Sequence, residues 1–266
     1  MSGSALWVWQ QVGRWRWLEC QLLAGWPHAF GSRQDHPHPP SQLAARLQLP
    51  PERAAWGHQV HGCNWVWADG ITEILGRKGE QDCSAGQGTP TRSQADAVIA
   101  RRQGDSAWVC TADCVPILVA SREWVAAIHA GWRGTAAGIL AKVLQEFLQA
   151  GIPAAGIRVA IGPSISGSVY QVSEEVAEQV LQSLPPGLDA RAALLPDPLP
   201  GKVRLDLRWV NGAQAQAQGI PPEHIAISPH CTLSQPQDFF SYRRDGSLKD
   251  EQGRHCVQWS GIGLRW

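Results

Sequence analysis

The sequence predicts an α/β protein built on mixed sheets. Near-continuous apolar runs at Val115–Ala120 and Trp124–Ala130 are typical of strands that are covered on both faces. Directly after them, apolar residues recur at helical spacing from Ile139 to Leu148. Elsewhere strand-like and helix-like segments interleave without a regular β-α-β rhythm, which favours mixed sheets over a doubly wound sheet.

The other expected elements are short and are separated by proline and glycine. Strands are expected, in order, at Leu6–Gln10, Trp15–Leu23, Ala97–Ala100, Ser106–Cys110, Ile157–Ile161, Val203–Leu207, His224–Ser228 and from about His255 past Ser260. The first two form a hairpin around Gly13-Arg14. Helices are expected at Ser41–Leu47, Ser173–Leu184 and Trp209–Gln218.

The central helix is expected to begin after Thr135 as its N-cap and to end at Gly151 and Pro153. Proline-rich sequence within residues 31–52 and a glycine-, serine- and charge-rich stretch at 70–94 predict surface loops.

Length and charge limit the function classes. The 266 residues contain no long linker and no internal repeat, so we expect a single domain over residues 1–266. The 23 basic and 23 acidic residues are scattered, which excludes the concentrated positive field of a nucleic-acid or membrane binder. There is no signal-like start and no apolar run of about 18 residues. A cytoplasmic protein with a small polar or neutral substrate is expected.

Three short stretches hold the candidate chemistry: HQVHG (58–62), TADC (111–114) and HAGWRG (129–134). Each places an imidazole or a thiol at the end of a strand-like run beside a glycine or a tight turn, where scaffolds present functional groups. His61, Cys114 and His129 would supply two imidazole nitrogens and one thiolate. Such a set leaves a fourth tetrahedral position open, as catalytic zinc requires, and a thiolate also suits copper.

The spacing leaves other interpretations open. His58 and His61 with Cys110 and Cys114 could form a closed structural zinc site. Alternatively, Cys114 could be a nucleophile activated by His129, as in a cysteine hydrolase. These residues could also be ordinary core or surface side chains.

Three further residues are candidates for substrate binding. Arg133 stands in the turn before the central helix, where a guanidinium and backbone donors would attract an anion such as phosphate. Asp113 could orient a ligand histidine or exchange a proton, and a structural role is an equal alternative. Arg243, followed by Arg244, could line a pocket. For both arginines a solvated surface position is the alternative.

Six motifs follow one another along the chain: QVHG (59–62), TADCVPIL (111–118), HAGWRGTAAGI (129–139), IGPSI (161–165), LDL (205–207) and FFSYRRDG (239–246). In this order they resemble the YfiH-type laccase-domain proteins, which were named as polyphenol oxidoreductases and later recognised as purine nucleoside phosphorylases. The resemblance extends from about residue 28, in HAFGSR, to about residue 254, and it brings Arg33 forward as a further candidate for substrate binding.

The resemblance implies one domain with a layered α-β-β-α fold and zinc on His61, Cys114 and His129. It implies phosphorolysis of adenosine, inosine, guanosine and methylthioadenosine, together with deamination of adenosine. We expect zinc and Arg133 to position the phosphate, and zinc to activate a water for deamination. Copper and oxidase activity have also been described in the family. Three scattered ligands cannot build a several-copper cluster, so a copper-dependent polyphenol oxidase is the weaker alternative, followed by the Cys-His hydrolase and a non-catalytic binding module.

Two positions depart from the family pattern. Arg33 is followed by QDHPHPP, where family members often have a glycine-rich GGVS-like stretch. After IGP the family usually has Tyr-Glu-Val, and this chain has Tyr170-Gln171-Val172. Gln171 cannot serve as a base or an anion, which bears on purine preference and on the balance of the two activities.

Overall fold

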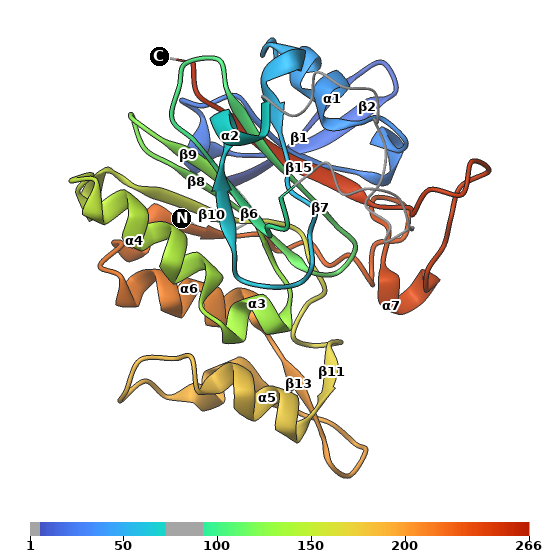
Figure 1. Cartoon of the computed structure of the whole chain (residues 1–266). Coiled ribbons are helices and arrows are strands. Elements are labelled where there is room, and N and C mark those ends of the chain that lie inside the picture. The colour runs from blue at the N-terminus through green and yellow to red at the C-terminus, as the bar shows by residue number, and fades with distance from the viewer. Residues whose placement is uncertain (1–5, 73–92, 266) are drawn as a thin grey trace.

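The computed structural model describes residues 6–72 and 93–265. Two six-stranded sheets pack face to face, and helices cover their outer sides (Figure 1). Each sheet contains both parallel and antiparallel pairs. The predicted mixed α/β class and the α-β-β-α layering are therefore confirmed.

The first sheet carries the N- and C-terminal strands. In spatial order its strands are β1 (Trp7–Val12), β2 (Trp15–Cys20), β3 (His28–Gly31), β15 (Gln258–Gly263), β7 (Ser106–Thr111) and β4 (Ala54–Ala55). The strands β1 and β2 form the predicted hairpin, with Trp7 opposite Cys20. Helix α1 (Pro40–Arg46) covers the outer side, where Leu43 and Ala44 pack with Trp108.

The second sheet is formed by the buried central strands. In spatial order its strands are β14 (Ile225–Ile227), β10 (Arg158–Ile161), β8 (Val115–Ala120), β9 (Val125–Ala130), β6 (Ala97–Ala100) and β5 (Trp65–Trp67). Every residue of β6, β8 and β9 is buried, as expected for apolar runs covered on both faces. A short helix, α2 (Ala68–Thr72), follows β5.

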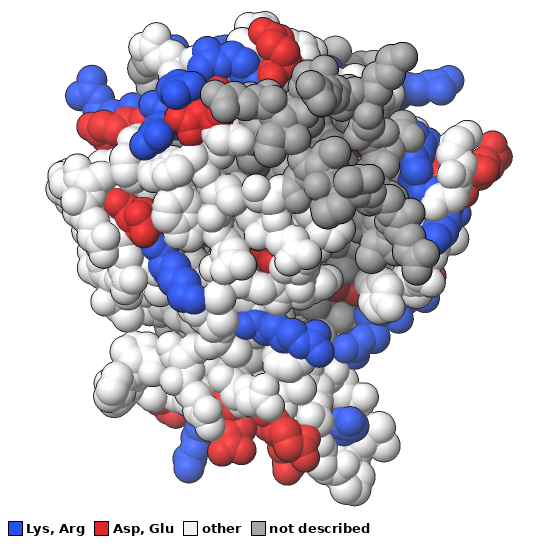
Figure 2. Space-filling model, viewed as in Figure 1, with Lys and Arg blue, Asp and Glu red and all other residues white. Residues whose placement is uncertain are grey.

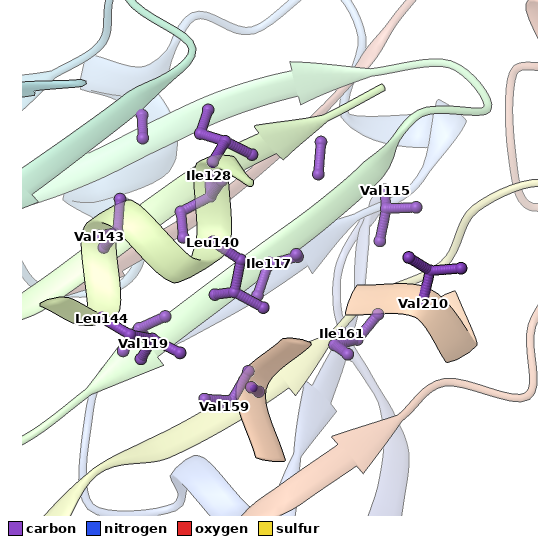
Figure 3. Close-up of a cluster of buried hydrophobic side chains, with 14 of the residues drawn as sticks. Val115, Ile117, Val119, Ile128, Leu140, Val143, Leu144, Val159, Ile161 and Val210 are labelled. Atoms are coloured by element: carbon purple, nitrogen blue, oxygen red, sulfur yellow. The ribbon is translucent and has the colours of Figure 1, made fainter. Parts of the chain in front are cut away.

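Three helices cover the outer face of the second sheet: α3 (Trp132–Ala136), α4 (Ile139–Gln149) and α6 (Leu207–Ala217). Figure 3 shows Leu140, Val143 and Leu144 of α4 directed at side chains of the sheet, among them Ile117 and Ile128. Since these side chains are fully buried, apolar burial fixes α4 on the sheet.

The prediction of one central helix capped by Thr135 is wrong. Gly138 adopts a left-handed conformation with φ of 70° and separates α3 from α4. Thr135 lies inside α3, where it is fully buried and its hydroxyl accepts a hydrogen bond of 3.1 Å from Asn211. The N-cap of α3 is instead Gly131.

A small third sheet lies outside the two main sheets. It contains β11 (Gln171–Ser173), β13 (Lys202–Leu205) and β12 (Leu194–Pro196), with helix α5 (Glu174–Leu181) beside it, and is the lowest part of Figure 1. The expected strand to residue 207 ends earlier, because the Asp206 side chain accepts hydrogen bonds from the amides of Arg208 and Trp209 and caps α6.

Helix α7 (Tyr242–Asp245) lies in the C-terminal segment, before β15. Most of the predicted loop at 70–94 falls outside the described residues. Within the described part of the chain, no helix has the length and apolar character needed to cross a membrane.

Candidate metal centre

The strand register gathers the candidate residues at one end of the second sheet. In the antiparallel pair β8–β9, Val115 lies opposite Ala130, so Cys114 comes opposite Gly131. In the pair β6–β9, Ala97 lies opposite Ile128, which brings Asp96 beside His129. The His129 amide donates a 2.7 Å hydrogen bond to the Asp96 carbonyl.

Cys114 lies in the turn that joins the two sheets. Strand β7 of the first sheet ends at Thr111, and β8 of the second sheet begins at Val115. Within this turn Asp113 has φ of 92°, a left-handed conformation that is uncommon for residues other than glycine. The Cys114 side chain is a free thiol at the end of the turn.

The Asp113 carboxylate anchors this turn to the C-terminal segment. It accepts hydrogen bonds of 2.6 Å from Thr232 Oγ1, 3.0 Å from Ser241 Oγ and 2.7 Å from the Arg243 amide. Asp113 is also buried. These contacts favour the structural role over the orientation of a ligand histidine, and a part in substrate binding stays a prediction.

His61 is held in a strained loop. Its φ is 58°, in the left-handed region, and its side chain is exposed. The amides of Val60, His61 and Gly62 all point at the Asp96 carboxylate, with N···O distances of 3.3, 2.9 and 2.7 Å. Asp96 therefore sets the conformation of this loop.

His61, Cys114 and His129 converge. Their ligand atoms all lie within 4.8 Å of one another, and the Cys114 Sγ is 4.0 Å from the His61 Nδ1. The Nδ1 of His129 donates a 2.8 Å hydrogen bond to the Asp96 Oδ1. The Nε2 of His129 is therefore the nitrogen that is available to coordinate a metal. A thiolate and two imidazoles that converge in this way are a donor set that suits a zinc or copper ion.

Gly131 leaves space beside these three side chains. A Cβ built at Gly131 would lie 3.1 Å from the Cys114 Sγ, 3.3 Å from the His61 Nδ1 and 3.9 Å from the His129 Cε1. Its φ of −73° suits any residue, so backbone conformation does not require glycine here. The requirement comes from the contacts with the three side chains.

The electrostatics favour a thiolate. Burial by itself would raise the pKa of Cys114, but the charge and hydrogen bond of His129, with the hydrogen bond of His61, lower it to about 6. Burial would lower the pKa of His129, yet the Cys114 thiolate and Asp96 raise it to about 9. Both pKa shifts favour the thiolate form of Cys114 beside His129, and the thiolate is the form that binds metal.

Arg133 and Arg243 are exposed cations near the centre. The Arg133 guanidinium lies 4.4 Å from the ring centre of Trp132, and that of Arg243 lies 5.3 Å from the ring centre of Tyr170. Burial and the Cys114 charge raise the pKa of Tyr170 to about 12, against the opposing effect of both arginines. Tyr170 therefore shares the neighbourhood of the thiolate and both cations.

Arg33 is engaged elsewhere. Its guanidinium donates to the Pro236 carbonyl and lies 4.8 Å from the ring centre of Phe240. The residue after Phe240, Ser241, donates a hydrogen bond to Asp113. Arg33 is therefore connected to the turn that carries Cys114 only indirectly, through the C-terminal segment. Direct contact with substrate stays a prediction.

The alternative of a closed structural zinc site is not supported. The Cys110 amide and thiol both contact the Gln59 side chain, at 2.8 and 3.4 Å, and His58 pairs through its backbone with Gln94. In the described ranges, the group with ligand geometry includes His129 in place of His58 and Cys110.

The Gln171 side chain forms a hydrogen bond with Asp197. Its Nε2 donates a 2.9 Å hydrogen bond to Asp197, which also pairs with Arg204. Its backbone carbonyl accepts a 3.0 Å hydrogen bond from the Arg243 guanidinium. The Gln171 side chain therefore holds the third sheet together.

Sequence reasoning missed Asp96, Gly131 and Tyr170. Asp96 directly precedes the apolar run Ala97–Ala100, just as Cys114 precedes Val115–Ala120, and that repeated placement could have identified it. Gly131 lies directly after the apolar run that ends at Ala130, so it too adjoins a strand end. Tyr170 belongs to the stretch Tyr170-Gln171-Val172 that corresponds to the family's Tyr-Glu-Val, but nothing in the sequence connects it with the three metal-ligand candidates.

Comparison with known proteins identifies the family of the chain. The chain belongs to the family described as multi-copper polyphenol oxidoreductase laccase, whose pattern matches residues 38–260. This confirms the resemblance seen in the motifs.

Particular relatives carry more specific names. The chain is 39% identical over 276 residues to a purine nucleoside phosphorylase of Synechocystis sp., covering 98% of each protein. It is 39% identical over 206 residues to a protein named adenosine deaminase from an unknown prokaryotic organism, covering 77% of this chain and 74% of that protein. Its fold matches the crystal structure of YlmD from Geobacillus stearothermophilus with a TM-score of 0.77 and 27% identity, covering 97% of this chain and 99% of that one.

Proposed function

We propose that this protein is a zinc-dependent purine nucleoside phosphorylase whose metal is held by His61, Cys114 and His129. The observation that carries the proposal is the convergence of these three side chains within 4.8 Å. A full-length relative bearing the phosphorylase name supports the substrates, which are purine nucleosides and phosphate.

The surrounding cations suit phosphate. Figure 2 shows basic side chains along the level of α3 and α7, above the third sheet. Arg133 belongs to α3 and Arg243 to α7, and both are exposed. Two hydrogen bonds orient Arg243. Its guanidinium donates to the Gln171 carbonyl, and its backbone amide donates to the Asp113 carboxylate. We expect these guanidinium groups to bind and orient phosphate for attack at the ribose C1′ and to offset its charge.

Zinc, when bound, would supply Lewis-acid polarisation of a coordinated oxygen. The chain's own part is to present the thiolate of Cys114 and a neutral Nε2 of His129. Asp96 fixes the latter by accepting the Nδ1 hydrogen. The hydroxyl of the half-buried Tyr170 is protonated at neutral pH, and burial raises its pKa further, to about 12.

Adenosine deamination is the second candidate function. A relative of 39% identity is named adenosine deaminase, and a metal position left open by three protein ligands suits activation of water as well as binding of phosphate. The side chain of Gln171, which stands in place of the family's glutamate, forms a hydrogen bond with Asp197.

Two other functions, a Cys-His hydrolase and a copper oxidase, can be weighed against the same geometry. Cys114, His129 and Asp96 are also arranged as a nucleophile, base and orienting carboxylate, which is the pattern of a Cys-His hydrolase. A copper oxidase of the laccase type is less well supported, because one ligand group was found among the described residues, where a several-copper cluster needs more. His61 favours the metal, since a hydrolase needs no second imidazole beside the thiol.

The test is phosphate-dependent release of hypoxanthine from inosine by protein of measured zinc content. Cys114→Ala is compared with Cys256→Ala, a thiol outside the ligand group. We expect release that requires phosphate, that is lost with the metal in Cys114→Ala, and that persists in Cys256→Ala. Conversion of adenosine to inosine without phosphate measures the second activity.

Each alternative has its own outcome. Full activity of metal-free Cys114→Ala would refute the metal mechanism. Activity that survives excess chelator but is lost on alkylation of Cys114 would identify the hydrolase. One zinc per chain with no turnover of any nucleoside would refute the phosphorylase and leave a binding module.

A further inference from the structure

We propose that Asp96 is the positioning residue of the metal centre, whose single carboxylate joins the two histidines so that they bind the ion as one unit. The proposal rests on the metal site inferred above. It does not depend on which reaction that site performs.

The Asp96 side chain is fully buried and uses both oxygens. Its Oδ1 accepts hydrogen bonds from the His129 Nδ1 at 2.8 Å and from the His61 amide at 2.9 Å. Its Oδ2 accepts from the amides of Gly62 at 2.7 Å and Val60 at 3.3 Å. A carboxylate offers about four lone-pair sites, so its accepting capacity is filled by these four donors.

The bond to His129 selects the metal-binding nitrogen. Because Nδ1 carries the hydrogen that Asp96 accepts, Nε2 is left with its lone pair free. The carboxylate also fixes the plane of the ring and makes it a stronger donor, as carboxylates behind metal-binding histidines generally do.

The bonds to residues 60–62 act on the other histidine through its backbone. His61 has φ of 58°, a conformation that costs on the order of 1–3 kcal/mol and persists only where its surroundings impose it. Three consecutive amides directed at one carboxylate impose it here. Without that acceptor the loop is free to relax, and the His61 ring moves away from Cys114.

A merely structural carboxylate would not link these two effects. Asparagine at position 96 has nearly the same size but only one accepting oxygen, so its NH2 group must face N–H donors. Its oxygen can accept from the His129 Nδ1 and the His61 amide, or from the amides of Val60 and Gly62, but not from both pairs at once. The variant Asp96→Asn therefore separates the positioning role from simple filling of the space.

The experiment measures Zn²⁺ affinity by competition with a chelator, and the visible spectrum of the Co²⁺-substituted protein, for wild type and Asp96→Asn. Asp35→Asn is the matched control, because Asp35 is another buried carboxylate and accepts the Ser32 amide at a position outside the ligand group. We expect Asp96→Asn to bind Zn²⁺ about 10–100-fold more weakly and to alter the Co²⁺ spectrum, with Asp35→Asn like wild type in both. Faster amide exchange at His61 and Gly62 in the metal-free variant is the accompanying sign of loop relaxation.

Wild-type affinity and an unchanged Co²⁺ spectrum in folded Asp96→Asn would overturn the proposal. If that variant does not fold, ¹⁵N NMR of the wild-type protein decides, since the proposal requires metal on the His129 Nε2 and a hydrogen on Nδ1, and the reverse assignment overturns it. Failure of wild type to bind Zn²⁺ or Co²⁺ would overturn the metal site itself. Absence of phosphorolysis with normal metal binding would overturn only the proposed reaction.

Discussion

Replacing Gly131 by alanine should weaken metal binding without unfolding the protein. The added methyl carbon would lie 3.1 Å from the Cys114 Sγ and 3.3 Å from the His61 Nδ1, which are themselves 4.0 Å apart. In a triangle with these sides, the median from the methyl carbon to the midpoint of the Sγ–Nδ1 line is about 2.5 Å long. Non-bonded carbon contacts prefer about 3.5–4.0 Å, so the methyl group competes for the space in which the donors meet.

The size of the effect follows from overpacking. Forcing a methyl group into occupied space typically costs about 1–3 kcal/mol. In the metal-free protein the exposed His61 ring can move aside, so this cost falls mainly on the metal-bound state. A difference of about 1–3 kcal/mol between the two states corresponds to about 5–150-fold weaker binding. The loss of stability at the N-cap of α3 should be about 1 kcal/mol or less.

The assay is chelator competition for Zn²⁺ together with urea unfolding of the metal-free proteins. Gly25→Ala is the matched control, because a Cβ there meets nothing within 4 Å. Zn²⁺ affinity of Gly131→Ala equal to that of wild type would refute the argument that the missing side chain keeps the centre open. A Gly131→Ala protein that is unfolded without metal would refute the argument that only the metal-bound state is affected.

Three further changes test other parts of the structure. Gln171→Glu places a second carboxylate against Asp197 in place of a 2.9 Å hydrogen bond, so we expect faster amide exchange in β11 and β13 and a lower melting temperature, with zinc content unchanged. Asp35→Asn removes a carboxyl whose pKa burial raises from 3.8 to about 7. Because the folded pKa is the higher one, this group's contribution to stability is full below about pH 4 and is lost as the pH rises through about 7. The variant should therefore gain on wild type as the pH rises from about 4 to 8 in urea unfolding, with a ceiling of about 4 kcal/mol, and a constant difference would contradict the raised pKa. Phe147→Ala empties a fully buried position of α4 and should lower the free energy of unfolding by about 3–5 kcal/mol in the same assay, whereas a loss below about 1 kcal/mol would contradict its place in the core.

Apolar periodicity predicted the central fold well. The strand Val115–Ala120 has the expected bounds, and the stripe from Ile139 onward forms the buried face of α4. The predicted helix and strand boundaries were wrong where one residue is compatible with two local structures. Thr135 can cap a helix or lie within one, and its burial against Asn211 decides for the interior. Asp206 could equally continue a strand or begin a helix.

The candidate site was predictable in its donors and unpredictable in its supports. Imidazoles and a thiol beside strand ends are visible in the sequence, and the structure brings them together. The placement of Asp96 before an apolar run makes it a candidate, but the sequence does not decide between Asp96 and Asp113 as the carboxylate behind the donors, because both adjoin buried strands. Only the register of β6 against β9 shows that Asp96 meets His129 while Asp113 faces the C-terminal segment.

The connection between β7 and β8 would give the proposed metal centre a role in stability. Cys114 ends the segment that passes from the first sheet to the second, whereas His129 lies within the second sheet and His61 in the loop before it. An ion bound to Cys114, His129 and His61 would cross-link the connection between the two sheets to the second sheet and to the loop that precedes it. Since metal would bind the folded chain in preference to the unfolded one, each tenfold rise in free metal above its dissociation constant adds about 1.4 kcal/mol to the free energy of unfolding. Resistance to heat would then depend on the metal supply, and a chelated sample would melt earlier than a loaded one even with every contact between the sheets intact.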